Sequence, residues 1–187
     1  MMAKITLLDD TTRPRAPALK GAQENHKIPG RRLKAIHRHH VQQMTEVRRV
    51  MDLLSEGAVA PEKLREAFNG LDLHQSMRLF GNLCGQECDM LKGHHDIESH
   101  YLFPPLHSRG NDGIRKVVER LMAEHKVIHH LLEEFETKIS DLARMPDGVR
   151  FAAVKHTYQT LERIVLSHFK YEETELETAI GFYEIEI

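Results

Sequence analysis

The segment VVERLMAEHKVIHHLLEEFETKI, residues 117–139, decides the fold class of this chain. Its apolar side chains recur every three or four residues, which is the period of an amphipathic α-helix. The resulting stripe comprises Val118, Leu121, Ile128, Leu132, Phe135 and Ile139. His125 lies on the same stripe, although burying an unpaired imidazole is costly. The segment therefore predicts a long helix that carries a polar group on its buried face.

Three further segments show the same periodicity. The predicted long helices cover residues 31–54, 72–101, 114–143 and 149–179. A short helix is expected at 61–68, where Pro61 suits a first helical turn. Residues 1–30 are polar and Pro-rich and are expected to form an N-terminal arm, and residues 31–187 are expected to form the domain. Long amphipathic helices with short connections predict an all-α protein, an antiparallel up-and-down four-helix bundle.

Glycine and proline mark the expected irregularities of these helices. Gly57 is expected to end the first long helix, and Pro104-Pro105 are expected to stop the second. Gly81, Gly85 and Gly93 lie inside the second helix, where each costs up to about 1 kcal/mol relative to alanine. A close helix contact or a local kink would explain them.

Composition excludes several classes of protein. The 187 residues carry a formal net charge of −2 without a long single-signed block, which disfavours nucleic-acid binding and a membrane-surface role. No apolar run approaches the length of a membrane span, and the N-terminal residues do not resemble a signal peptide. Two cysteines are too few for a disulfide framework. We therefore predict a cytoplasmic protein without a membrane or nucleic-acid partner.

Histidine is unusually frequent and unusually placed. The chain has 14 His and 11 Gly, although glycine is ordinarily the commoner residue. His and Glu recur four residues apart, a spacing that places both on one helix face. The pairs are His94 with Glu98, His125 with His129, and His168 with Glu172, while the first helix offers His37 and His40. Imidazole and carboxylate groups turned inward from four helices predict a metal site.

The segments HHDIESHYLFP (94–104), EHKVIHHLL (124–132) and HFKYEE (168–173), preceded by AIHRHHV (35–41), resemble the hemerythrin-like HHE cation-binding domain. The resemblance covers about residues 31–178. It implies a non-haem centre of two iron ions, joined by an oxo or hydroxo group. The ligand set that it implies is His37, His94, Glu98, His125, His129, His168 and Glu172, with both glutamates bridging.

Three positions depart from the pattern of oxygen-carrying relatives or leave it open. His129 would supply the second histidine of the third helix, which many HHE domains lack. Glu173 follows His168 by five residues and competes with Glu172, which follows it by four. Ser99 stands where many relatives have a second acid. For His40 and His95, the sequence leaves open whether they bind metal.

The resemblance implies several functions. The leading expectation is binding or sensing of O2, H2O2 or NO, with weak catalase- or peroxidase-like turnover as an open question. The alternatives are an iron-dependent regulatory protein with a protein partner, and an iron donor for the repair of iron–sulfur proteins.

Cys84 and Cys88 are expected to pack as small apolar residues, with a redox-active thiol pair as the alternative.

Overall fold

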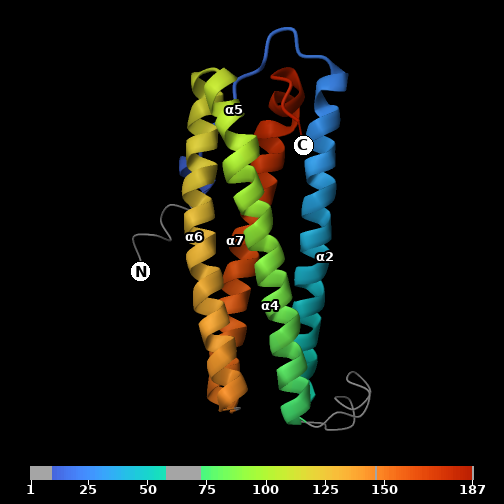
Figure 1. Cartoon of the computed structure of the whole chain (residues 1–187), viewed down its shortest axis with the longest axis vertical. Helices are drawn as coiled ribbons and strands as arrows, with labels where there is room; N and C mark the ends of the chain where they lie inside the picture. Colours follow the sequence, from blue (N-terminus) through green and yellow to red (C-terminus); the bar gives the residue numbers. More distant parts are fainter. Residues whose placement is uncertain (1–9, 58–72, 146, 187) are drawn as a thin grey trace. The chain divides into compact units, whose positions relative to one another are not determined.

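The computed structural model describes residues 10–57, 73–145 and 147–186, and most of these residues are helical (Figure 1). The long helices are α2 (Lys27–Gly57), α4 (Leu73–Ile97), α6 (Asp112–Arg144) and α7 (Gly148–Phe182). The shorter elements are η2 (Asp10–Thr12), η3 (Glu24–His26), the π-helical turn η4 (Glu98–Leu102) and α5 (Phe103–Arg109). The described residues contain no strand, so the all-α prediction is confirmed. The short helix expected at 61–68 lies outside the described residues.

The helix boundaries follow from local hydrogen bonding. At the start of α6, the side-chain oxygen of Asn111 accepts hydrogen bonds from the N–H groups of Gly113 and Ile114. At the start of α7, Asp147 accepts one from the N–H of Arg150. Both side chains satisfy donors that a helix N-terminus leaves unpaired. The described part of α2 ends at Gly57, and the residues after it lie outside the described range.

The expected stop at Pro104-Pro105 is wrong. The helical path continues through η4 into α5, which ends only at Arg109. The two prolines occupy the first turn of α5, where an α-helix does not need their missing N–H groups. The π-helical turn just before them starts this new helix, and it begins at Glu98, a predicted metal ligand.

Gly85 and Gly93 of α4 do not mark close helix contacts, and the surroundings of Gly81 lie outside the described residues. A Cβ atom at Gly85 or Gly93 would meet nothing within 4 Å. The close approaches lie elsewhere: a Cβ at Gly30 would overlap the backbone of Glu177, and one at Gly181 would overlap that of His26. At these two positions glycine lets α2 and η3 approach α7.

The chain divides into two compact units. The first comprises Met1–His39, Lys92–His130 and Arg163–Ile187. Its core is apolar and includes Leu33, Phe103, Leu106, Ile114, Leu121, Leu176 and Ile180. Every residue of the predicted donor set belongs to this unit.

The second unit comprises His40–Leu91 and Leu131–Glu162. Its core includes Met44, Leu132, Phe135 and Tyr158, all nearly fully buried, and the Phe135 and Tyr158 rings lie 5.3 Å apart. The stripe predicted for residues 118–139 of α6 is buried throughout, as expected. In α2, Ile36 is 41% exposed and takes no part in the buried core.

Candidate metal centre

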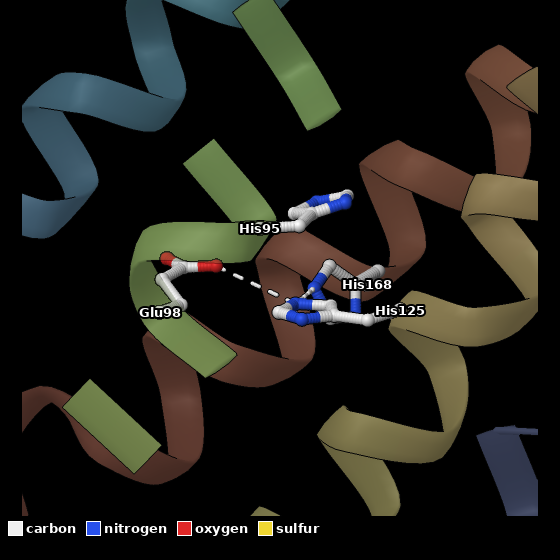
Figure 2. Close-up of side chains that lie close together, drawn as sticks. All are labelled: His95, Glu98, His125 and His168. Carbon is white, nitrogen blue, oxygen red and sulfur yellow. Dashed lines mark hydrogen bonds and ion pairs between the residues drawn. The ribbon is translucent and has the colours of Figure 1, made fainter. Parts of the chain in front are cut away.

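Glu98 lies at the centre of two clusters of metal-ligating side chains. The first cluster is His37, His94 and Glu98, and the second is His95, Glu98, His125 and His168 (Figure 2). Within each cluster the ligating atoms lie within 4.8 Å of one another. We call these sets cluster 1 and cluster 2. Glu98 belongs to both, so the two candidate sites share one carboxylate.

The two oxygens of Glu98 face different clusters. Oε1 lies 3.1 Å from Nε2 of His94 and 3.5 Å from Nε2 of His37. Oε2 lies 3.4 Å from Nε2 of His125. A carboxylate with one oxygen towards each of two sites has the arrangement of a bridging ligand.

Glu172 lies between the same two clusters. Its Oε2 is 3.5 Å from Nε2 of His37 and 3.8 Å from Nε2 of His168, one turn earlier on α7. Glu173 lies instead behind His37, where its Oε1 is 3.2 Å from Nδ1, and it also pairs with Lys34. Of the two candidate acids, Glu172 is therefore the one that accompanies the other donors.

Several buried atoms that could ligate a metal have no hydrogen-bond partner in the described part of the chain. They are both carboxylate oxygens of Glu98 and Glu172, both ring nitrogens of His95, and Nε2 of His129. Buried polar groups are normally satisfied, and a metal-binding role is one standard explanation where the protein itself supplies no partner. A mixed set of imidazole and carboxylate donors suits iron and similar metals. The residues present therefore fit a metal centre.

The electrostatics of the cluster also favour a bound cation. Burial raises the pKa of Glu98 well above its usual range, and the adjacent Glu172 raises it further. Burial, Glu173 and Glu124 raise the pKa of Glu172 to about 8. Burial and neighbouring imidazoles lower the pKa values of His95 and His125 far below the usual range. Neutral imidazoles are the metal-binding form, and a cation would stabilise both carboxylates as anions.

Two of the imidazoles have a side-chain partner at Nδ1, the ring nitrogen that faces away from the cluster. Glu124 is fully buried, and its Oε2 lies 3.1 Å from Nδ1 of His168. Ser99 Oγ lies 2.9 Å from Nδ1 of His125. Both contacts involve Nδ1 and leave Nε2 towards the cluster, where the two Nε2 atoms are 3.1 Å apart. Outer contacts of this kind fix the tautomer and ring orientation of ligating histidines.

Arginines hold Glu124 in place. Nε of Arg13 donates to Oε1 at 2.9 Å, and Nη2 donates to Oε2 at 3.0 Å. Arg120 donates to Oε1 at 2.8 Å. Burial alone would raise the pKa of Glu124, but the hydrogen bonds from His168 and the arginines lower it to about 2. Glu124 is therefore an anion that accepts from Nδ1–H of His168.

The structure brings together most of the histidines and acids expected from the sequence. His37, His94, Glu98, His125, His168 and Glu172 are all buried. His129 is only partly buried and lies outside both clusters, and its ring centre is 6.5 Å from that of His125. His40 belongs to the second unit, where its Nδ1 is 3.3 Å from Glu87.

Three residues that contribute to the site were not assigned to it from the sequence. His95 was left open but is fully buried in cluster 2. Glu124 directly precedes His125, so its position beside the motif was a usable signal. Arg13 gave no signal, because its contact with Glu124 spans 111 residues of chain.

The cysteines do not behave as a reactive pair. Cys84 and Cys88 lie in the second unit, are not joined by a disulfide, and are both buried. Burial raises the pKa of Cys84, and Cys88 and Glu87 raise it further, so its thiolate is disfavoured at neutral pH. A packing role agrees with these surroundings better than thiol redox chemistry does.

The fold and the cluster together define a helical metal-binding protein. The family model described as the hemerythrin HHE cation binding domain matches residues 28–180. The chain therefore belongs to the hemerythrin HHE cation-binding family. Comparison with curated proteins and with solved structures gives no match. No helix among the described residues is long and apolar enough to cross a membrane.

Proposed function

We propose that this chain holds two iron ions within an antiparallel four-helix bundle and uses them to bind or sense O2, H2O2 or NO. The arrangement of Glu98 carries the proposal, because its two oxygens face different imidazole clusters. Glu172 supports it, since one of its oxygens lies within 4 Å of a histidine from each cluster. One mononuclear site would not need two carboxylates in this position.

The ligands divide between the two ions. His37 and His94 would hold one ion, His125 and His168 would hold the other, and Glu98 and Glu172 would bridge them. A bound iron pair supplies reversible binding or reduction of small oxidants. The histidines contribute neutral Nε2 donors, since Ser99 and Glu124 occupy Nδ1 of His125 and His168.

Burial limits what can reach the site. The six proposed ligands are between 0% and 8% exposed. The rings of Phe103 and Phe169 also pack against them, with Phe169 stacked 4.0 Å from His37 and Phe103 lying 5.1 Å from His125. Such an enclosure admits diatomic molecules and peroxide more readily than a metabolite-sized substrate.

Metal analysis with optical spectra tests this function. Protein from iron-replete cells is measured under argon, then in air, then with peroxide or NO. We expect about two iron ions per chain and near-ultraviolet bands that respond to these ligands. His168→Ala should lose iron, whereas His156→Ala, at an exposed position of α7, should keep it. Protein without iron, or a His168→Ala variant with its full complement, would refute the proposal.

A second candidate function is an iron-dependent switch for a protein partner. The observation that favours it is the contact between Arg13 of the N-terminal arm and Glu124, which in turn contacts His168. Through this connection, a change at the iron centre could alter how the arm is held. A pull-down that compares iron-loaded and iron-free protein tests it: a partner that prefers one state supports the switch, and identical partners in both states contradict it.

A further inference from the structure

We propose that His95, and not His129, supplies the third imidazole of the ion held by His125 and His168. This inference rests on the proposed iron centre and sharpens its ligand set. The resemblance to oxygen carriers placed His129 in that position. The structure instead places His95 with His125, His168 and Glu98 in one cluster of four buried ligands (Figure 2).

Helix geometry explains how two adjacent histidines both reach the site. Successive residues of an α-helix are about 100° apart around the axis. Leu91 and Glu98 are both buried and mark the inward line of α4 and the following turn. His94 and His95 therefore fall on opposite sides of this line. His94 reaches cluster 1 and His95 reaches cluster 2, with Glu98 between them.

The environment of His95 is that of a ligand without its ion. The residue is fully buried, and neither ring nitrogen has a hydrogen-bond partner among the described residues. Its ring lies 4.2 Å from that of His125, and the two rings are nearly parallel. A core histidine with a structural role would satisfy at least one nitrogen, since burying an unpaired polar group is costly. Metal coordination removes that cost.

His129 is less well placed for the same ion. It is only partly buried, and it belongs to neither cluster. Its ring is 5.6 Å from that of His95 and 6.5 Å from that of His125. The ring of His95 is therefore closer to the ring of His125 than the ring of His129 is, and His129 lies beside His95.

Iron retention in matched variants tests the assignment. The proteins compared, all purified from iron-replete cells, are wild type, His95→Ala, His129→Ala and His100→Ala. Two properties are measured: the rate of iron loss to a chelator and the Mössbauer spectrum. Outer contacts typically change metal affinity by about 10–100-fold. We expect His95→Ala to lose iron at least that much faster and to change the signal of one iron. His129→Ala should change retention less, and His100→Ala, at an exposed position, should match wild type.

The outcomes separate this inference from the proposed function. If wild type holds two irons and His129→Ala loses iron while His95→Ala keeps it, the assignment of His95 is wrong and the iron centre stands. If wild type holds no iron, the iron centre itself is wrong. Circular dichroism checks the folding of each iron-free variant. Should His95→Ala fail to fold, His95→Gln replaces it, and full iron retention in that variant also contradicts the assignment.

Discussion

At the scale of single residues, the site depends on buried groups whose charge is compensated by other groups. Glu124 shows this for the outer contacts, because it is fully buried and yet anionic beside His168, Arg13 and Arg120. The inner carboxylates differ, since Glu98 and Glu172 have no arginine beside them among the contacts of the described residues. Their compensation must come from protons or from a metal ion.

Replacing Glu124 tests the outer contact. Glu124→Gln keeps the size of the side chain but removes the anion that orients His168 through Nδ1. We expect iron affinity to fall by about 10–100-fold, the range typical of such contacts. Glu119→Gln is the control, because Glu119 is exposed on the same helix and pairs with His107 at the surface. Competition with a calibrated chelator measures both, and equal affinities would contradict the role of Glu124.

The iron-free protein should become less stable as the pH rises above neutrality. Burial raises the pKa of Glu172 from its usual 4.5 to about 8, so the folded state holds a proton that the unfolded state has released. Stability from this group is present below pH 4.5 and is lost as the pH rises through about 8. The buried histidines oppose this trend mainly below neutrality, because their pKa values are lowered from 6.5.

Thermal unfolding of the iron-free protein between about pH 7 and about pH 8.5 measures this effect. The melting temperature of wild type should fall across this range. That of Glu172→Gln should fall less, since glutamine does not titrate. The difference should diminish in the iron-loaded protein, where the carboxylate is held as an anion. Parallel pH profiles for wild type and Glu172→Gln would show that this carboxyl group is not responsible.

Periodicity and spacing in the sequence predicted several of the candidate metal ligands. His125 was predicted because it lies on an apolar stripe, and His168 and Glu172 because they are spaced four residues apart; the structure buries all three. His95 could not be separated from a surface residue, since His94 beside it already filled the expected position. Glu98 was predicted as a shared ligand only through the family resemblance. The direction of its two oxygens depends on neighbouring helices and is not encoded in the local pattern.

At the scale of elements, the N-terminal arm and the π-helical turn modify the simple helical bundle. The arm is tied down between Asp10 and Ala16, where Arg13 contacts Glu124 and Ser167, and Ala16 N–H donates to Glu175. Tyr171 donates to the carbonyl of Pro14, and the guanidinium of Arg13 lies 4.7 Å from its ring. No periodicity predicts such contacts, because they join residues far apart in the sequence.

Arg13→Ala should loosen both the arm and the iron centre. The variant removes the two hydrogen bonds that Arg13 makes to Glu124, although Arg120 remains. We expect faster amide hydrogen exchange in residues 10–16 and about 10-fold faster iron loss to a chelator. Arg15→Ala is the control, since Arg15 is 73% exposed and pairs with Glu175 instead. Faster exchange with unchanged iron retention would show that the arm is not coupled to the centre.

The π-helical turn explains why the second helical segment does not stop at the two prolines. Two adjacent prolines ordinarily end a helix, because they lack N–H donors. Here the change of hydrogen-bonding pattern at η4 begins a new helix, and the prolines fall in its first turn. A rule based on residue types alone does not anticipate this local change.

At the scale of the whole molecule, the candidate metal ligands of clusters 1 and 2 lie in one of the two compact units. The second unit has its own core around Phe135 and Tyr158, and it contributes none of the residues of clusters 1 and 2. Among the described residues of this unit, the apolar stripe of α6 was predictable, since it recurs every three or four residues. The division of the chain into two units was not, because each long helix runs through without a break in its pattern.

Truncating this second core should affect stability without changing the iron stoichiometry. Phe135→Ala removes a ring that is 1% exposed, and such changes typically cost about 3–5 kcal/mol of unfolding free energy. Chemical denaturation measures the loss, and metal analysis of the folded fraction should still give the wild-type iron count. Phe182→Ala, at a partly exposed position near the end of α7, should cost much less. Loss of iron from folded Phe135→Ala would contradict this separation.

The proposed function depends on two metal sites that share the carboxylate of Glu98. Mössbauer spectroscopy of wild type and Glu98→Gln, both purified from cells grown on ⁵⁷Fe, tests it most directly. Wild type should contain two iron ions per chain that are magnetically coupled through their bridges. Glu98→Gln should lose the coupling together with much of the iron, because an amide is a poor bridging ligand. A single iron per chain in wild type, or two irons without coupling, would contradict the account.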